Sequence, residues 1–387
     1  ARSNKTANAL TSIGVAPGDR VGLLLMNGVE FVETFFAAAK IGAVNVPLNV
    51  RLIAEELEFI LKDSGTSVLI FSEEFAAVCA ELASRGDRTD ITTWIQVGGT
   101  PADGVLEYNE WVDIAADTEI ESTASGDDYA FIMYTSGTTG LPKGVIHSHD
   151  TVMWSLLTGT ASLDFRLGDR FLNSLPLFHV GALNPVLANA YAGGTTVLMR
   201  SFDPAESWRL ITEEKINSTL MVPAMLQFMQ MTYNADVHDL STLRWVLSGA
   251  APVPVTLIEA YADLGVEIHQ VYGLTETAGP GCVIIGDDAK THVGSTGRAF
   301  FHGQVRVIGE DGSDCDPGES GEVLLAGPNV MVGYWNRPEA TAEAIVDGWL
   351  HTGDAGVLDQ DGFLTIVDRI KDMLISGGEN VYPAEIE

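Results

Sequence analysis

Cysteine, basic residues and long apolar runs are all scarce in this 387-residue chain. The three cysteines, Cys79, Cys282 and Cys315, are far apart and odd in number, so they form neither a disulfide framework nor a zinc site and fit a reducing cytoplasm. His147 and His149 come closest to a metal-ligand spacing, and a polar entrance to a helix explains them better. No apolar run approaches the roughly 18 residues that a membrane-spanning helix needs. We therefore expect a cytoplasmic protein without a transmembrane segment, for which peripheral contact with a membrane stays open.

The shortage of positive charge excludes one large class of partners. Lysine and arginine number 21 against 53 aspartates and glutamates, which leaves a net charge of −32. A protein that follows nucleic-acid phosphates needs the opposite balance, so nucleic acid is not expected as a partner. The surplus of acids is typical of a well-solvated surface, and it makes any basic residue near an anion site stand out. Residues 1–14 already have the pattern of an amphipathic helix rather than of a signal peptide, so the natural chain is expected to begin further upstream.

Apolar residues are plentiful and arranged in a regular alternation. They make up 46% of the chain, enough for a core larger than that of one small domain. From residue 20 onward, short apolar runs alternate with amphipathic runs, and the hydrophobic period switches between two and about 3.6 residues. This alternation predicts βαβ units, and hence a mostly parallel sheet with helices on both faces. The predicted elements are strand 19–25, helix 29–43, strand 43–48, helix 54–65 and strand 66–72.

The second half of the chain changes its pattern once. A polar, acidic stretch over residues 116–128 is predicted to be a surface connection, and a predicted strand, 129–135, follows it. After about residue 290, short strands separated by Gly, Asp and Pro turns indicate a small β-barrel or antiparallel sheet. The predicted fold class is therefore α/β, with two mostly parallel βα subdomains packed together up to about residue 290 and a small β-barrel-like subdomain over 291–370. The strands predicted for the second α/β series are 171–177, 195–199, 218–223, 243–249 and 266–273.

The stretch YTSGTTGLPKG, residues 134–144, combines glycines, hydroxyl side chains and a single lysine directly after a predicted strand. Glycines let backbone amides approach a ligand, hydroxyls add donors, and the lysine adds a positive charge, so the composition suits a polyphosphate. An ordinary glycine-rich turn is the alternative that this stretch alone leaves open. A Walker-type loop is excluded by spacing, because Pro142 and Gly144 flank Lys143 where that motif has Gly and Ser or Thr. A dinucleotide-binding GxGxxG is absent as well.

Four further segments follow this loop along the chain: SGAAP (248–252), VYGLTET (271–277), WLHTGD (349–354) and DRIKDMLISGGENVYPAEIE (368–387). Together with the loop, and in this order, they resemble the motifs of the adenylate-forming superfamily. That superfamily includes acyl- and aryl-CoA ligases, peptide-synthetase adenylation domains and firefly luciferase. The first third of the chain is similar to the family's usual opening, so the resemblance covers the whole sequence.

The resemblance implies a nucleotide site. Glu276 would be the magnesium carboxylate, and Thr275 would contact a phosphate. Asp354 would accept both ribose hydroxyls, and Arg369 would donate to the ribose or α-phosphate side, although a plain surface ion pair is the alternative for these two. The residues implied to hold the β- and γ-phosphates of ATP are Thr135, Ser136, Gly137, Thr138, Thr139 and Lys143. Those implied for the adenine are Gly249, Ala250, Gln270 and Tyr272, with close helix–strand packing as the alternative for the two small residues.

The chemistry implied by the resemblance uses ATP, Mg²⁺ and coenzyme A. A carboxylate attacks the α-phosphorus to give an acyl-adenylate and pyrophosphate, and a thiol then takes the acyl group as a thioester. The enzyme's work is mainly to align two anions and offset their repulsion. His179, with Lys143, Thr275 and Glu276, is expected to act at this catalytic site. Whether the thiol belongs to CoA or to a carrier protein stays open.

The resemblance also divides the chain into domains. Residues 1–370 would form the large N-terminal adenylation domain, and Lys371 would be the hinge to a small C-terminal domain. Residues 371–387 would then be the start of that domain. The lysine that the family uses for adenylation is expected beyond Glu387.

The acid is the least defined part of the prediction. LPLFHVGAL, residues 175–183, lacks the aspartate that pairs an amino group in peptide-synthetase domains, which disfavours an amino acid. Gly181 stands where hydroxycinnamate ligases carry a tyrosine, and Val271 stands where many fatty-acyl-CoA ligases have glycine; both are expected in the acyl pocket. We expect a medium- or long-chain fatty acid, with an aryl or alicyclic acid as the alternative. A protein that binds acyl groups or nucleotides without catalysis is disfavoured by the intact Lys143, Glu276, Asp354 and Arg369.

Overall fold

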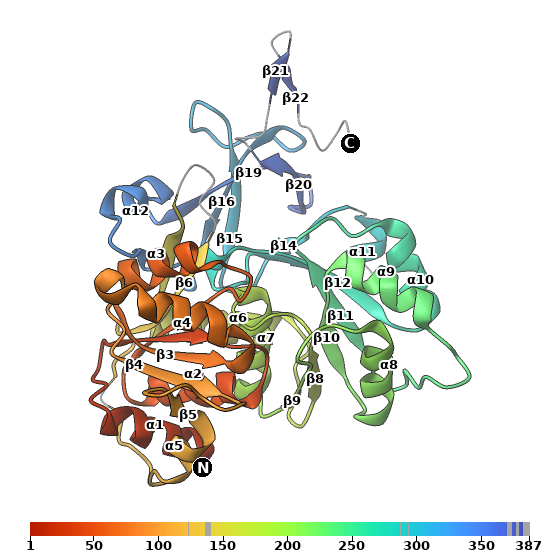
Figure 1. Ribbon diagram of the computed structural model, residues 1–387. Helices are drawn as coiled ribbons and strands as arrows, with labels where there is room; N and C mark the ends of the chain where they lie inside the picture. The colour runs from red at the N-terminus through yellow and green to blue at the C-terminus, as the bar shows by residue number, and fades with distance from the viewer. Residues whose placement is uncertain are drawn as a thin grey trace.

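Two α/β layers and an antiparallel sheet make up the protein (Figure 1). The computed structural model describes residues 1–122, 124–135, 141–286, 288–292, 294–369, 374–376 and 379–381. In Figure 1 the first α/β layer lies to the left of the second, and the antiparallel sheet lies above and between them. A short hairpin of β21 (Leu374–Ser376) and β22 (Glu379–Val381) follows.

The first sheet has the strand order β17-β7-β6-β2-β1-β3-β4-β5. Its pairings are parallel from β6 across to β5, and antiparallel between β6, β7 and β17 at the other edge. Its strands are β1 (Arg20–Leu24), β2 (Val44–Pro47), β3 (Thr66–Ser72), β4 (Thr93–Val97), β5 (Leu106–Glu107), β6 (Tyr129–Thr135), β7 (Lys143–Ser148) and β17 (Gly333–Tyr334). The helical segments of this part are α1 (Arg2–Ser12), α2 (Val29–Lys40), α3 (Ala54–Ser64), η1 (Glu73–Phe75), α4 (Ala76–Ser84), η2 (Gly86–Arg88) and α5 (Tyr108–Asp113).

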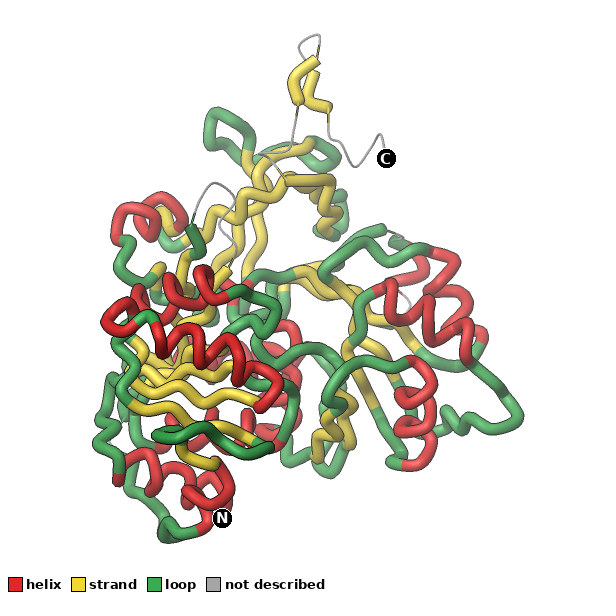
Figure 2. Tube along the Cα trace, viewed as in Figure 1, coloured by secondary structure: helices red, strands yellow, loops and turns green. Residues whose placement is uncertain are grey.

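The second sheet has the order β14-β13-β12-β11-β10-β8-β9, with parallel pairing from β12 to β9. Its strands are β8 (Arg170–Asn173), β9 (Thr195–Leu198), β10 (Ser218–Leu220), β11 (Trp245–Gly249), β12 (Glu267–Tyr272), β13 (Cys282–Ile284) and β14 (Arg298–Ala299). The accompanying helical segments are α6 (His149–Ser162), α7 (Val180–Tyr191), α8 (Pro204–Glu213), α9 (Pro223–Thr232), α10 (Val255–Asp263), η3 (Thr275–Thr277) and α11 (Asp288–Thr291). Figure 2 shows the helices packed against the strands of both layers.

The third sheet is antiparallel throughout and has the order β15-β16-β19-β18, with β20 paired to β19. Its elements are β15 (Gln304–Ile308), β16 (Ser320–Ala326), α12 (Pro338–Ala344), β18 (Ile345–Val346), β19 (Trp349–Leu358) and β20 (Leu364–Arg369). Of the two forms predicted after residue 290, the described strands adopt the antiparallel sheet.

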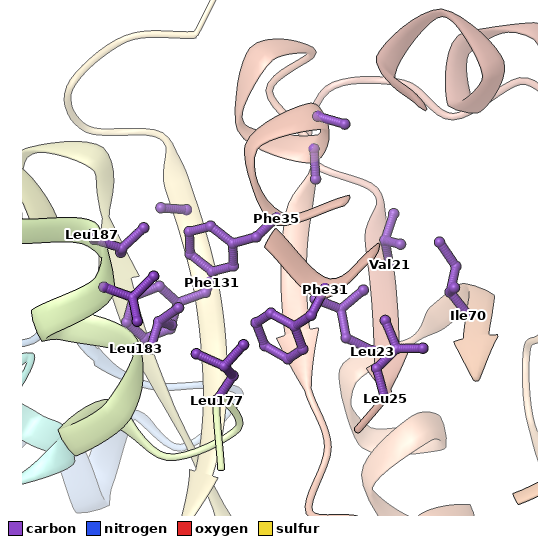
Figure 3. Packing of buried hydrophobic residues seen from close by; sticks show 14 of the residues in the cluster. Val21, Leu23, Leu25, Phe31, Phe35, Ile70, Phe131, Leu177, Leu183 and Leu187 are labelled. Atoms are coloured by element: carbon purple, nitrogen blue, oxygen red, sulfur yellow. The ribbon is translucent and has the colours of Figure 1, made fainter. Parts of the chain in front are cut away.

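One buried apolar cluster joins the first two layers. Phe31 and Phe35 of α2 point from the helix toward β1 and toward Phe131 of β6 (Figure 3). On the other side of Phe131, Leu183 and Leu187 of α7 reach the same cluster. Because side chains from both α/β layers share this core, the two layers are fixed against each other. The junction between them can therefore hold a site with defined geometry.

The strand β17 returns to the first sheet from a distant part of the chain. Gly333 pairs with Ile146 and Tyr334 pairs with Val145 of β7. Trp335 then donates its backbone N–H to the Gly144 carbonyl at 2.7 Å. Residues far beyond 290 therefore complete the sheet edge that follows the phosphate loop.

The predicted fold class is confirmed, including the parallel sheets and the antiparallel sheet. The predicted strands 66–72 and 129–135 coincide with β3 and β6. Most described residues of the acidic stretch 116–128 are exposed, as expected for a surface connection. Among the residues that the structure describes, no helix has the length and apolar character needed to cross a membrane.

Candidate functional site

The phosphate loop joins two neighbouring strands of the first sheet. Thr135 ends β6 and pairs in register with Lys143, the first residue of β7. Lys143 Nζ lies 4.9 Å from the centroid of the Tyr334 ring, a distance typical of a cation–π contact. Four of the predicted phosphate ligands, Ser136, Gly137, Thr138 and Thr139, lie outside the described residues. The described ends of the loop place its lysine at the sheet edge, against an aromatic face.

Glu276 is linked to the same tyrosine. It lies in η3, and its Oε1 accepts a hydrogen bond from the Tyr334 hydroxyl at 2.8 Å. Burial, reinforced by the nearby Glu276 charge, raises the pKa of Tyr334, so this hydroxyl stays protonated and donates. Glu276 is half-buried. Tyr334 thus brings together the predicted lysine, which begins β7, and the predicted metal carboxylate, which lies in η3.

A side chain of β7 contacts the backbone of η3. His147 is completely buried, and its Nε2 lies 2.7 Å from the Thr275 carbonyl, an acceptor, so Nε2 carries the proton. Burial lowers the pKa of His147 to about 4, which keeps the ring neutral. The Glu276 carbonyl accepts from the Met331 N–H at 2.7 Å. The other ring nitrogen of His147, Nδ1, lies 3.0 Å from the Thr151 hydroxyl in the first turn of α6, and His149 is the first residue of that helix, so both histidines lie at a polar helix entrance as predicted, and His147 also contacts η3.

Asp354, Arg369 and Tyr272 meet at the edge of the third sheet. Asp354 is 5% exposed; its Oδ2 accepts from the Tyr272 hydroxyl at 2.6 Å, and its Oδ1 lies 2.8 Å from Arg369 Nε. Burial raises the pKa of the Asp354 carboxyl, and the hydrogen bond from Tyr272 and the charge of Arg369 oppose that rise. The predicted ribose residues are therefore adjacent, and the ion pair that was their alternative explanation is also present.

Gly249 and Ala250 lie where β11 meets β12. A Cβ atom on Gly249 would lie 2.3 Å from the Val271 carbonyl oxygen, so the close approach of the two strands requires glycine. Ala250 has a φ of +66°, in the left-handed region that an alanine rarely adopts. Both residues line the pocket described below, so tight packing and a ligand-facing position coexist here.

Gln270 lies apart from this group. Alternation along β12 places its side chain on the face opposite to Val271, beside Ser248, its partner in the register. Its Nε2 is buried without a hydrogen-bond partner in the described part of the chain. A contact between Gln270 and adenine therefore remains a prediction.

A pocket of about 430 Å³ opens between α7 and the second sheet. His179 precedes the first residue of α7, and the pKa of His179 is lowered by the packing around its ring and by the charge of Arg51. Among the described residues that line the pocket there is no lysine, arginine, aspartate or glutamate. The predicted residues that line it are His179, Gly181, Gly249, Ala250, Val271 and Thr275.

A magnesium ion fits the chemistry of this site. Mg²⁺ prefers oxygen ligands and is commonly bound by one or two carboxylates together with substrate phosphates. No group of three or more His, Cys, Asp or Glu in the described ranges forms a complete metal cage. The half-buried Glu276 carboxylate, close to Lys143 through Tyr334, is the type of single ligand that such an ion needs. The sequence did not predict a role for Tyr334, because this residue lies 58 positions from Glu276 and belongs to no motif that includes it.

Comparison with known proteins places this geometry in a family. A family model described as AMP-binding enzyme matches residues 1–335, and the chain belongs to that adenylate-forming family. The chain is 44% identical to the long-chain-fatty-acid–CoA ligase FadD13 of Mycobacterium tuberculosis, over 100% of its own length and 75% of that protein. It is 43% identical, with the same coverage, to a feruloyl-CoA synthase of Amycolatopsis.

A solved structure agrees with this assignment. The o-succinylbenzoate–CoA synthetase MenE of Bacillus subtilis, in complex with ATP and magnesium ion, matches with a TM-score of 0.89 and 34% identity, covering 100% of this chain and 77% of that one. These findings support acyl-CoA ligase activity of the adenylate-forming family, for which ATP, Mg²⁺ and CoA were predicted. Since the relatives are named for fatty and aromatic acids alike, the family does not define the acid.

Proposed function

We propose that this protein activates a carboxylic acid with ATP, forming an acyl-adenylate and then an acyl-CoA thioester. The observation that carries the proposal is the link Lys143–Tyr334–Glu276, which joins a cation to the carboxylate next to Thr275, a residue that lines the apolar pocket. Lys143 offsets phosphate charge, and Glu276 would hold magnesium, which neutralises the leaving pyrophosphate when bound. Asp354 and Arg369 would give up part of their contact with each other to form hydrogen bonds with the ribose.

The same residues explain how the acid would be aligned. Gly249, Ala250 and Thr275 line the pocket together with residues of α7, so a carboxylate beside these three would face the nucleotide while its tail would extend along α7. Aligning two anions is the main barrier of the first step, and a rigid wall of strand and helix provides that alignment. His179 lies at the same pocket and stays neutral at pH 7, because its pKa is lowered.

For the acid itself, a medium- or long-chain fatty acid remains our proposal, with an aromatic acid second. The lining is mostly apolar and has no charged side chain among the described residues, so it suits a neutral tail. A second carboxylate or an amino group on the tail would be desolvated without a partner. The similarity to a feruloyl-CoA synthase is what keeps an aromatic acid as the second candidate.

The domain division and the location are proposals as well. Residues 1–370 would act as the adenylation domain, with the β-rich subdomain over 291–370, and Lys371 would be the hinge to a C-terminal domain. Lys371 lies outside the described residues. A cytoplasmic location is proposed from the three unpaired cysteines.

The decisive experiment replaces the metal carboxylate. Glu276→Gln should lower acid-dependent release of pyrophosphate by about a hundredfold or more, because the amide cannot hold Mg²⁺ but can still accept from Tyr334. ATP binding in the presence and absence of Mg²⁺ is measured by calorimetry as a readout separate from turnover. The exposed Glu343→Gln is the matched control, expected to behave as the wild type. Wild-type activity and an unchanged magnesium effect in Glu276→Gln would remove this carboxylate from the metal role.

A further inference from the structure

An aspartate in the last turn of α3 is bound by residues that flank the phosphate site. Asp63 lies at the C-terminal end of α3, where the helix dipole disfavours a carboxylate. Its side chain is nevertheless only 12% exposed, so it is largely withdrawn from water. A charged group in such a place needs hydrogen-bond partners from other elements. Figure 1 shows α3 beside β6, the strand that leads into the phosphate loop, and one partner of Asp63 comes from that strand.

The two carboxylate oxygens of Asp63 bind two different parts of the chain. Oδ2 accepts a hydrogen bond from the Tyr134 hydroxyl at 2.7 Å, and Oδ1 lies 2.8 Å from Arg337 Nη2. Burial and the Asp63 carboxylate raise the pKa of Tyr134, so its hydroxyl stays protonated and donates. Tyr134 precedes Thr135, where β6 ends, and Arg337 follows Tyr334 by three residues. One carboxylate therefore joins the start of the phosphate loop to the segment that carries Tyr334.

The backbone of Asp63 binds the same segment. The last carbonyls of a helix have no partner within it, and the Asp63 carbonyl accepts from the Trp335 indole N–H at 2.9 Å and from the Asn336 amide at 3.3 Å. Trp335 in turn donates its backbone N–H to the Gly144 carbonyl at 2.7 Å. A Cβ on Gly144 would lie 3.0 Å from the Tyr134 ring, so the ring and the glycine are in close contact. These contacts form a closed ring that begins and ends at Asp63.

We propose that Asp63 is a positioning residue of the phosphate site, which holds the two ends of the loop and Tyr334 in a fixed arrangement for ATP. This inference rests on the proposed function and adds to it a residue that does not touch the substrate. Tyr334 lies directly before Trp335 and contacts Lys143 and Glu276. Loss of the Asp63 bonds would give these contacts more freedom, so the affinity for ATP with Mg²⁺ should fall. The acid should be little affected, because the described lining of its pocket does not include Asp63.

The main test compares Asp63→Asn with the wild type. The amide has nearly the same shape as the carboxylate, but its NH₂ group would face a donor, because both partners of the carboxylate are donors. Binding of ATP with Mg²⁺, measured by calorimetry, should weaken by about fivefold to tenfold, a part of what one hydrogen bond to a charged group contributes. In assays of pyrophosphate release, KM for ATP should rise by a similar factor, with changes of less than about threefold in kcat and in KM for the acid.

Two further variants separate positioning from general support of the fold. Asp90→Asn is the matched control: it breaks the exposed ion pair of Asp90 with Lys62, the neighbour of Asp63 on α3, and should leave ATP binding unchanged. Tyr134→Phe removes only the hydroxyl that Asp63 binds, and should weaken ATP binding by about threefold. In the double variant Asp63→Asn/Tyr134→Phe, the loss of affinity should be smaller than the product of the two single losses, because both remove the same hydrogen bond.

Stability and affinity together decide whether Asp63 has this role. A lower melting temperature of Asp63→Asn with unchanged ATP affinity would mean that Asp63 only supports the fold, which overturns the proposal. An equal rise of KM for ATP and for the acid counts against it as well. If Asp63→Asn does not fold, Tyr134→Phe decides the matter, because it leaves the ion pair of Asp63 with Arg337 in place. Wild-type affinity in Tyr134→Phe then contradicts the positioning role.

Release of pyrophosphate distinguishes this inference from the proposed function. If the wild type binds ATP but no acid supports release, the ligase function fails, while the ATP affinities of the variants still decide the role of Asp63. If acids support release and Asp63→Asn binds ATP as the wild type does, the ligase function stands and the positioning role is wrong. If the wild type does not bind ATP with Mg²⁺, both are wrong.

Discussion

At the scale of single residues, Tyr334 joins two groups that the sequence keeps far apart. Its ring contacts the ammonium of Lys143, and its hydroxyl donates to the carboxylate of Glu276. One side chain therefore sets the separation between the cation and the anion of the phosphate site. We regard Tyr334 as a positioning residue, because it acts through Lys143 and Glu276 rather than on the substrate.

Replacing this hydroxyl should alter the requirement for magnesium. Tyr334→Phe keeps the ring under Lys143 but removes the hydrogen bond to Glu276, and hydrogen bonds to charged groups contribute about 1.5–3 kcal/mol. We expect the Mg²⁺ concentration for half-maximal pyrophosphate release to rise by roughly tenfold, with a smaller change in the rate at saturating Mg²⁺. A magnesium titration measures both. Tyr191→Phe, at an exposed tyrosine, is the matched control, and an unchanged titration for Tyr334→Phe would contradict the positioning role.

At the scale of elements, the pairing of β11 with β12 determines the shape of the pocket. Gly249 and Val271 are partners in the register, and both line the pocket, whereas Ser248 and Gln270 lie on the other face. A slip of this register by one residue would exchange the two faces. The close approach at Gly249 therefore serves both the packing of the sheet and the position of Val271 in the pocket wall.

Val271 is expected to limit the length of the acid. Val271→Gly should extend the pocket by about two methylene-sized units, each contributing about 0.8 kcal/mol of burial, so kcat/KM for longer acids should rise by about tenfold. The measurement is a ranking of acids of eight, twelve and sixteen carbons and benzoate. Val246→Gly is the control, because it makes the same change in β11 on the face away from the pocket. The idea fails if the ranking is the same in wild type and Val271→Gly.

The elements also show what could be predicted from the sequence. Strand 129–135 and strand 66–72 were predicted with their observed limits, because apolar runs bounded by turn residues are local signals. The nucleotide residues followed from motifs, and the structure brings Asp354 next to Arg369. The contact of Tyr334 with Glu276 could not be predicted, because it depends on how β17 returns to a sheet made of much earlier strands.

At the scale of the whole molecule, the proposed hinge controls which reaction can proceed. A proline at Lys371 would fix one backbone angle and hold the proposed C-terminal domain in one orientation. In the chain that carries this domain, Lys371→Pro should retain adenylation, measured by pyrophosphate exchange, and lose thioester formation, measured with CoA. Equal loss of the two half-reactions would argue against rotation about this residue.

The return of β17 also bears on how the protein can be divided. Gly333 and Tyr334 belong to the first sheet although, in sequence, they follow all strands of the second sheet and two of the five strands of the third. A fragment that stops near residue 290 would lose an edge strand of its first sheet, expose the backbone of β7 and leave Glu276 without the Tyr334 hydroxyl. If the α/β layers are expressed alone, the segment 333–335 therefore has to be included with them. If the β-rich part is exchanged between relatives, the same segment has to stay with the first sheet rather than move with its neighbours in sequence.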